Sequence, residues 1–315
     1  MTFEQRISAF NELGQFFNFI INNDSIEDKE LTEKFENWKE EAEYAVSDAE
    51  AYNNWFTKDN ITLALKSWSE ALTTDNLLAW TKDYPFAKTP KNVGIIMAGN
   101  LPLVGFHDLL SVVISGNNAL IKTSSKDDKL IKLAIKYLNS IDSEFESIIK
   151  IIERLQNFDA VIATGSNNTA RYFEQYFGKV PNIIRKNRTS VAVINGTETE
   201  EDLQNLGKDI FIYFGLGCRN VTKLYVKEET QLHKVFEAIF PWGENVINHP
   251  KYANNYDYNR AIYLLGKDEF LDNNFVLFKK DDNVHSPIAV VNFEIYEDVN
   301  EVKNYLIEND NQIQC

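Results

Sequence analysis

The sequence predicts an α/β protein built on parallel sheets. From Asn92 onward, short apolar runs of strand length alternate with segments of helix length. Several of these runs end in glycine or polar turns, whereas residues 1–90 are helical in pattern and rich in charge. Strands and helices in alternation indicate parallel sheets with helices on their faces. Because ligands of such sheets bind at the carboxyl ends of the strands, the turns that follow the strands are where functional residues are expected.

Residues 1–90 are expected to form a helical layer. Charged faces alternate with aromatic stripes that include Phe10 and Trp68. Aromatic residues at helical spacing are typical of amphipathic helices that pack on another element. Pro85 and Pro90 close this segment.

A first αβ set is expected over residues 91–195, which we assign to cofactor binding. Its strands are expected at 93–98, 118–123, 158–164, 181–187 and 189–194, and its helices at 103–114, 126–138 and 168–177. Ser124 or Ser125 is expected to cap the second of these helices.

A second αβ set is expected over residues 196–315, with the domain boundary near Asn195 and Gly196. Its helices are expected at 198–214, 232–240 and 299–308, and its strands at 221–226, 275–279 and 286–293. The chain stops at Cys315 just after a helix, where another strand is expected, so we expect a truncation at the C-terminus.

Composition excludes several classes of protein. The formal net charge of the 315 residues is −15, which argues against a nucleic-acid partner. The two cysteines, Cys218 and Cys315, argue against a disulfide framework and favour a reducing cytoplasm. No run approaches the roughly 18 apolar residues of a membrane span. The four histidines are scattered, so no metal site is expected.

The stretch 211–226 contains the main candidate for a catalytic residue. Its apolar helical run breaks at Gly215 and Gly217, Cys218 follows, and a strand-like run begins at Val221. A thiol between a helix and a strand lies among unpaired backbone N–H groups, which stabilise the thiolate nucleophile. The alternative is a buried structural cysteine.

Glycine or polar residues follow three strand ends that precede Cys218 in the chain. They are Gly99 and Asn100 with Pro102, Lys122 with Ser125, and Gly165 with Ser166. With this order and spacing, from about Asn92 to the C-terminus, the chain resembles the aldehyde dehydrogenase superfamily. More narrowly, it is similar to the LuxC-like bacterial acyl-CoA reductases. The resemblance implies an aldehyde-dehydrogenase-like α/β fold, with a Rossmann-type cofactor domain, a catalytic domain and an N-terminal helical layer.

The resemblance also implies a role for each of these residues. Asn100 matches the asparagine whose amide forms an oxyanion hole with the backbone N–H of the nucleophile, and Cys218 matches that nucleophile. Lys122 matches the lysine that hydrogen-bonds the adenosine ribose. Gly165 and Ser166 match a turn at a helix N-terminus that lies against the cofactor pyrophosphate. The alternatives are local: Asn100 forms a turn, Lys122 is a solvated strand end, and Ser166 is an ordinary helix cap.

Two positions depart from the family pattern. Hydrolytic aldehyde dehydrogenases carry a glutamate that activates water, and its position falls on Arg185 here. Members that exchange acyl groups with coenzyme A also lack this base. The glutamate that holds the nicotinamide ribose falls on Asn283, and His285 lies in the same turn. The alternative for His285 is a surface or core histidine.

The resemblance therefore implies reduction of a long-chain fatty acyl-CoA, or of an acyl-protein thioester, to the aldehyde through a thioacyl intermediate on Cys218. NADPH is the expected cofactor, because Ser125 stands where a glutamate would repel a 2′-phosphate and Lys126 follows it. NADH is the alternative, with Ser125 acting as a helix cap. For the whole protein, the alternatives are a hydrolytic aldehyde dehydrogenase and a non-catalytic member that binds acyl groups or a partner. A homo-oligomer is one option for its assembly.

Overall fold

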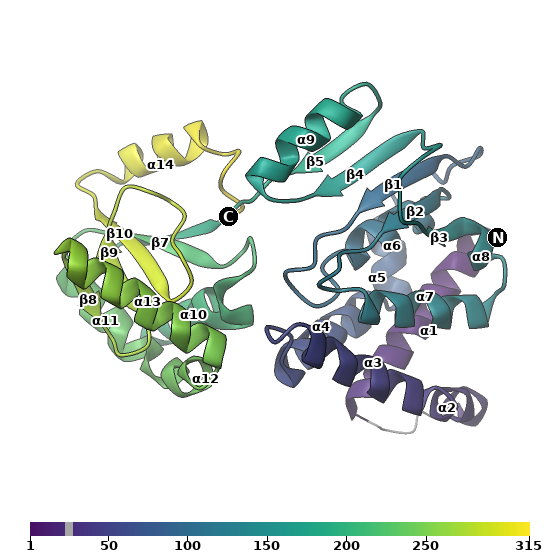
Figure 1. Ribbon diagram of the computed structural model, residues 1–315, viewed down its shortest axis with the longest axis horizontal. Coiled ribbons are helices and arrows are strands. Elements are labelled where there is room, and N and C mark those ends of the chain that lie inside the picture. The colour runs from purple at the N-terminus through teal and green to yellow at the C-terminus, as the bar shows by residue number, and fades with distance from the viewer. Residues whose placement is uncertain (23–27) are drawn as a thin grey trace. The chain divides into compact units, whose positions relative to one another are not determined.

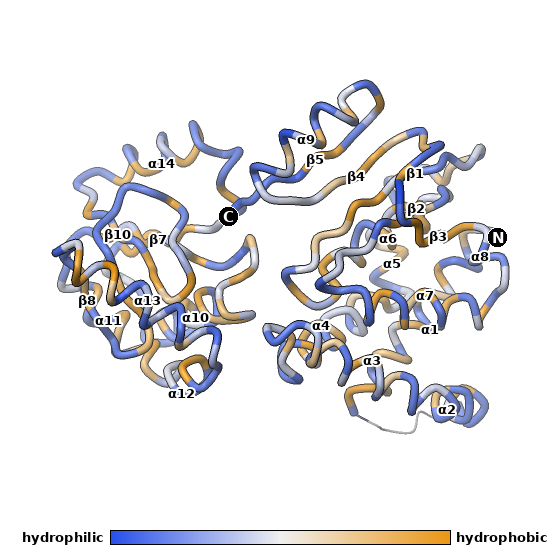
Figure 2. Tube along the Cα trace, in the orientation of Figure 1, coloured by the Kyte–Doolittle hydropathy of each residue, from blue (hydrophilic) through white to orange (hydrophobic). Residues whose placement is uncertain are grey.

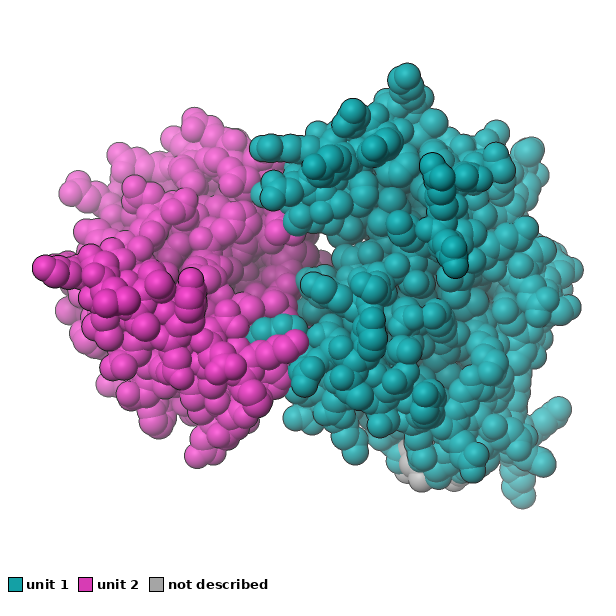
Figure 3. All heavy atoms as spheres, viewed as in Figure 1, with its two compact units in different colours: residues 1–186 teal, residues 187–315 magenta. Residues whose placement is uncertain are grey.

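The computed structural model describes residues 1–22 and 28–315, which form two compact units. The first unit comprises residues 1–186 and the second residues 187–315 (Figure 3).

The first unit contains a parallel sheet in the strand order β3-β2-β1-β4-β5 (Figure 1). Its strands are β1 (Asn92–Ile96), β2 (Asn118–Lys122), β3 (Ile149–Ile151), β4 (Ala160–Thr164) and β5 (Asn182–Arg185). The chain leaves the central strand β1 toward β2 and β3, and then returns past it to β4. The order of the strands therefore reverses between β1 and β4, which is the point where open α/β sheets bind ligands.

Helices connect these strands and cover the sheet. The connecting helices are α6 (Phe106–Ile114), α7 (Lys129–Ile141), α8 (Phe145–Ile148) and α9 (Asn167–Phe177). The N-terminal helices are α1 (Phe3–Asn22), α2 (Lys29–Glu36), α3 (Lys39–Tyr52), α4 (Lys58–Ala71) and α5 (Thr74–Thr81). Figure 2 shows apolar residues along the sheet strands and a mostly hydrophilic α2.

Most aromatic residues of the N-terminal segment pack in the core, as the sequence predicts, but Tyr44 and Trp80 are exposed. α1 packs on α4, α6 and α7. Phe16 stacks on Tyr137 of α7 with ring centroids 4.1 Å apart, and Phe10 and Phe17 meet Phe106 of α6 edge-on. The helical layer is therefore an extension of the first unit's core.

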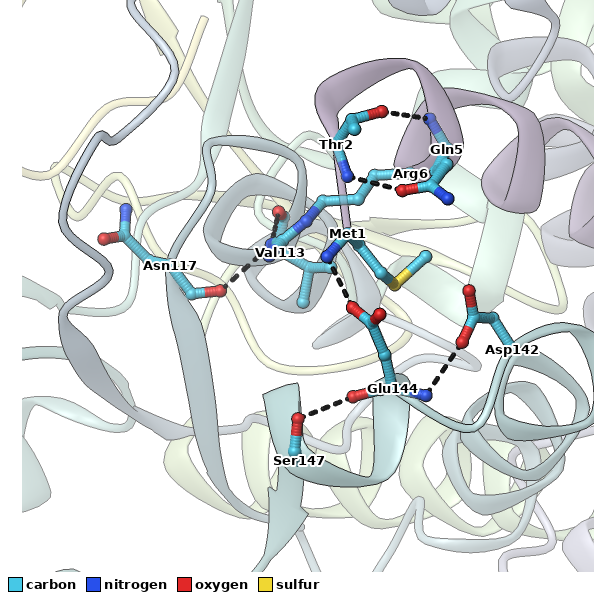
Figure 4. Close-up of polar contacts among 9 residues, drawn as sticks. All are labelled: Met1, Thr2, Gln5, Arg6, Val113, Asn117, Asp142, Glu144 and Ser147. Carbon is cyan, nitrogen blue, oxygen red and sulfur yellow. Dashed lines mark hydrogen bonds and ion pairs between the residues drawn. The ribbon is translucent and has the colours of Figure 1, made fainter.

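A buried arginine also ties α1 to α6 (Figure 4). The guanidinium of Arg6 donates hydrogen bonds to the carbonyls of Val113 and Asn117, where α6 ends. The last carbonyls of a helix have no partner within the helix, so a cation there satisfies them and complements the helix dipole. Nearby, the amine of Met1 forms an ion pair with Glu144.

The second unit contains a sheet in the order β6-β7-β10-β9-β8, parallel except for β8. Its strands are β6 (Ser190–Ile194), β7 (Val221–Val226), β8 (Phe270–Asp272), β9 (Leu277–Lys280) and β10 (Val290–Ile295). Its helices are α10 (Glu200–Phe211), η1 (Ile212–Gly215), α11 (Thr230–Ile239), η2 (Phe240–Trp242), α12 (Gly243–Ile247), α13 (Pro250–Gly266) and α14 (Val299–Glu308).

The structure corrects the expected domain boundary. β6 was expected in the cofactor domain, but its residues pair with β7 from Ser190 to Ile194. Backbone hydrogen bonding therefore places β6 in the second sheet, and the units divide between Lys186 and Asn187. Gly196, where the boundary was expected, has a φ of +94° in the connection from β6 to α10.

After α14 the chain returns to the second sheet, where it forms an isolated bridge. Ile313 bridges to Thr189 in parallel, the N–H of Gln314 donates to the carbonyl of Thr189, and Val191 donates to the carbonyl of Cys315.

Candidate functional site

Three loops gather at the carboxyl edge of the first sheet. They follow β1, β2 and β4, which are adjacent parallel strands. These loops carry Asn100, Lys122 with Ser125, and Gly165 with Ser166. The structure thus brings these sequence-predicted residues to one edge, beside the point where the strand order reverses.

The loop after β1 lies directly on the loop after β2. A Cβ atom added to Gly99 would lie 2.3 Å from Oγ of Ser124 and 3.1 Å from the backbone nitrogen of Asp127, so only glycine permits this approach. Leu103 takes a left-handed conformation with a φ of 56°, and its N–H donates to Oδ2 of Asp127 at 2.8 Å. Asn100 lies exposed between these two anchor points. The loop that presents Asn100 is therefore held at both ends by the loop after β2.

The loop after β2 is a closed turn rather than the start of a helix. The hydroxyl of Ser124 accepts from the N–H of Lys126, and the N–H of Asp127 donates to the carbonyl of Ser124. α7 begins at Lys129, three residues later than expected, and no serine caps it. The expectation that Ser124 or Ser125 caps a helix at Lys126 is wrong, because Ser124 instead closes this turn. Ser125 and Lys126 remain exposed on this turn, and Lys122 is exposed at the end of β2.

Asp127 is a buried carboxyl between these two loops. Only 3% of the residue is exposed, and within the described residues Oδ1 has no hydrogen-bond partner. Burial, with a smaller contribution from the charge of Asp128, raises its pKa to about 7, against the hydrogen bond from Leu103, which lowers it. The carboxyl that anchors the Asn100 loop therefore titrates near neutral pH.

The turn after β4 positions the N-terminus of α9. Ser166 is the N-cap residue, and its hydroxyl accepts from the N–H of Thr169 at 3.3 Å. A Cβ atom at Gly165 would lie 3.1–3.2 Å from Phe173 and Thr169, so glycine lets the helix start close to the strand. Ser166 therefore does cap α9, as the alternative reading has it. The N–H groups at the start of α9 lie at the carboxyl end of β4, where a helix N-terminus can bind a phosphate.

Arg185, at the end of β5, is held by an ion pair. Its Nη1 lies 2.5 Å from Oδ1 of Asp108, a buried carboxylate on α6. Burial raises the pKa of Asp108, but hydrogen bonds from His107 and Arg185 outweigh it and keep that pKa below its ordinary value. The carboxylate nearest to the expected base position is therefore a weak base with its charge already engaged.

Cys218 lies in the second unit, in an exposed turn just before β7. The turn runs from Gly217 to Asn220, and it is closed by a hydrogen bond from the N–H of Asn220 to the carbonyl of Gly217. The hydroxyl of Ser190 donates to the carbonyl of Cys218 at 3.1 Å. The thiol is not buried, so the structural-cysteine alternative does not describe it.

The loop between β9 and β10 carries Asn283 and His285. The side-chain amide and backbone N–H of Asn283 both donate to Oδ1 of Asp281, so this amide is engaged within its own turn. Burial lowers the pKa of His285, which favours its neutral imidazole. Asn292 fixes the loop by donating to the carbonyls of both residues.

Three site-forming residues were not identified from the sequence. They are Asp108, Asp127 and Asn220, and each acts through burial or through partners distant in sequence. For Asp127 and Asn220 the available signal was position, because they stand two residues after Ser125 and Cys218. Within residues 1–22 and 28–315, no cluster of three or more metal-ligating side chains occurs, and no helix is long and apolar enough to cross a membrane.

This architecture is that of the aldehyde dehydrogenases. Aldehyde dehydrogenase 21 from Physcomitrella patens, solved with the product succinate, aligns with a TM-score of 0.67 and 13% identity over 97% of this chain and 71% of that chain. An NAD⁺ complex of an aldehyde dehydrogenase from Bacillus cereus aligns with a TM-score of 0.65 and 14% identity, over 96% of this chain and 69% of that chain. An oxidoreductase from Marinobacter aquaeolei aligns with a TM-score of 0.67 and 11% identity, over 96% of this chain and 71% of that chain. At these identities the likeness shows the fold alone.

The family match is more specific than the match in fold. The family described as Acyl-CoA reductase (LuxC) matches residues 19–241, which is well over half of the chain, and this chain belongs to it. A comparison with curated proteins gives no match.

Proposed function

We propose that the protein reduces a fatty acyl-CoA, or an acyl-protein thioester, to the aldehyde with NADPH, through a thioacyl intermediate on Cys218. The observation that carries this proposal is the exposed thiol of Cys218 in a closed turn at the start of β7. An exposed thiol among backbone N–H groups suits a nucleophile, and membership of the LuxC family supports an acyl thioester as its target.

The carboxyl edge of the first sheet supports a nicotinamide cofactor. Lys122, at the end of β2, offers a cation, and Ser125, on the turn that follows, offers a hydroxyl donor. The N-terminus of α9 follows β4. Helix N-termini bind phosphates, and lysine forms charge-assisted hydrogen bonds with them. The Bacillus cereus aldehyde dehydrogenase, which shares this fold, was solved with NAD⁺.

In the proposed reaction, the thiolate of Cys218 attacks the thioester carbonyl carbon. The backbone N–H of Cys218 and the amide of Asn100 donate hydrogen bonds to the oxyanion that forms. The bond to the coenzyme A sulfur breaks, coenzyme A thiolate leaves, and the acyl group stays on Cys218. NADPH, when bound, would supply the hydride that reduces the acyl carbon. Collapse of the resulting hemithioacetal returns the thiolate of Cys218 and releases the aldehyde.

The ion pair of Arg185 with Asp108 supports reduction over hydrolysis. Hydrolysis of the thioacyl group needs a base to activate water. Arg185 cannot act as one, and the lowered pKa of Asp108 makes its carboxylate a poor proton acceptor.

The test is to incubate the protein with a long-chain acyl-CoA and NADPH and to follow the loss of nicotinamide absorbance. Separately, acyl-CoA without cofactor should leave an acyl mass on the peptide that contains Cys218. Cys218→Ser should abolish both signals, whereas the matched control Cys315→Ser should retain them. An adduct confined to Cys315, or turnover by Cys218→Ser, would overturn the assignment. Acyl binding without an adduct would favour a non-catalytic acyl-binding protein.

A further inference from the structure

We infer that Asn220 is the positioning residue that aims Cys218 and its backbone N–H at the acyl carbonyl. This inference rests on the proposed function, because it concerns how the nucleophile's turn is held.

The side chain of Asn220 links three parts of the second unit. Its Oδ1 accepts from the N–H of Gly217 at 2.7 Å, on the near side of the Cys218 turn. Its Nδ2 donates to the carbonyls of Asp209 and Ile212, at 2.9 and 3.0 Å, where α10 ends. The residue is 6% exposed, so these bonds form in a site that water does not share.

The backbone of Asn220 completes the link to the sheet. Its N–H closes the turn onto Gly217, and its carbonyl accepts from the N–H of Ser190 on β6. Both hydrogens of the side-chain amide and both backbone groups are therefore used. A buried amide satisfied in this way specifies one geometry, because any shift leaves a polar group unpaired.

The segment before the cysteine needs such a restraint. Tyr213 and Phe214 both adopt left-handed conformations, with φ of 54° and 58°, and Gly215 follows with a φ of 76°. Non-glycine residues persist in this region only where the surroundings hold them. The ring of Phe214 lies 4.4 Å from that of His249, which anchors it from one side. Asn220 satisfies the carbonyls that the reversed chain leaves at the end of α10.

The result is a selective pattern of backbone donors around the thiol. In the turn, the N–H groups of Gly217 and Asn220 are both bonded within the protein. Within the described part of the chain, the N–H groups of Cys218 and Arg219 have no protein partner. Asn220 thus holds the N–H of Gly217 and closes the turn, and the N–H of Cys218 is left for an oxyanion.

The test distinguishes the positioning of the Cys218 thiol from its accessibility. Acylation of Cys218 by acyl-CoA needs the oxyanion donor, whereas alkylation by iodoacetamide needs only a reachable thiol. Both rates are measured by mass spectrometry on the Cys218 peptide in the full chain. In Asn220→Ala we expect acylation to slow about 10²-fold, the scale of a lost oxyanion donor, and alkylation to stay within about threefold.

Two further variants complete the experiment. Asn259→Ala is the matched control, because Asn259 is 7% exposed in the same unit and donates to the carbonyl of Ile288; both rates should be unchanged. Asn220→Asp keeps the acceptor for Gly217 and loses the donors to α10, so it should slow acylation selectively; it decides the matter if Asn220→Ala does not fold.

Two results would overturn the inference while leaving the proposed function intact. One is an unchanged acylation rate in Asn220→Ala or, if that variant does not fold, in Asn220→Asp. The other is a parallel loss of acylation and alkylation, which would make the role merely structural. Failure of the native protein to form the acyl adduct would instead overturn the proposed function, and the inference with it.

Discussion

Replacing Asp127 by asparagine should stabilise the first unit above neutral pH and have little effect in acid. The carboxyl is buried, accepts one hydrogen bond from Leu103, and has no partner on Oδ1 within the described residues. Its ionised form is therefore poorly solvated, which is why burial raises its pKa to about 7. Asparagine keeps an oxygen for the Leu103 N–H and carries no charge.

The direction of this pH dependence of stability follows from proton binding. The folded protein holds a proton on Asp127 up to about pH 7, whereas the unfolded chain releases it near 3.8. The folded state binds more protons between these values, so this group's contribution to stability falls as pH rises from about 4 to 7 and then stays low. At 1.36 kcal/mol per pH unit the full difference is about 4 kcal/mol. Relaxation around the charge reduces this, so we expect Asp127→Asn to gain about 1–3 kcal/mol at pH 8 relative to pH 4.

The assay is urea unfolding at both pH values, followed by tryptophan fluorescence. Four of the five tryptophans (Trp38, Trp55, Trp68 and Trp80) lie in the first unit, so the signal reports mainly on it. Asp159→Asn is the control, because Asp159 also accepts from a backbone N–H but is exposed; it should leave the pH dependence unchanged. Parallel pH profiles for the native protein and Asp127→Asn would refute the reasoning, because Asp127 would then be ionised throughout.

Three further predictions concern catalysis. Asn100→Ala should lower kcat by roughly 10²–10³ with little change in Tm, since it removes one proposed oxyanion donor; a normal rate would make Asn100 only a turn former. The isolated thioacyl enzyme should persist in buffer and transfer its acyl group to added coenzyme A, because Arg185 stands at the base position; prompt release of free fatty acid would favour hydrolysis. Native protein should show a higher kcat/KM with NADPH than with NADH, and Ser125→Glu should penalise NADPH selectively by repelling its 2′-phosphate; equal use of both cofactors, or no selective loss, would contradict this.

Most of the first sheet was predictable because its signals are local, but its edge strand β3 was not predicted. Apolar runs of strand length that end in glycine or polar turns identify β1, β2 and β4 without knowledge of their partners. Parallel pairing then places the three following loops at one edge, as the structure confirms. The sheet to which β6 belongs was not predictable in this way, because its partner β7 lies about thirty residues further along the chain and the intervening Gly196 resembles a boundary.

A helix that lacks an apolar face was also not predicted from the sequence. α13 (Pro250–Gly266) is rich in tyrosine and asparagine, and its apolar residues do not gather on one face, so periodicity gives no signal. Asp127 and Asn220 have a related explanation. Aspartate and asparagine are usually exposed turn residues, and only tertiary packing shows that these two are buried and hold loops in place.

The effect of having arginine at position 185 depends on a partner that is distant in the sequence. The sequence shows that the expected glutamate is absent, but a lone arginine there would add a positive charge to the site. The structure places Asp108, 77 residues earlier in the chain, against its guanidinium. The carboxylate is buried, whereas the Arg185 side chain stays 43% exposed. The residue at the expected base position is therefore a cation paired with a buried carboxylate. Arg185→Ala would consequently leave Asp108 buried without its cationic partner, so we expect the pKa of that carboxyl to rise. Such a variant would be a less clean test of hydrolysis than the lifetime of the native thioacyl enzyme.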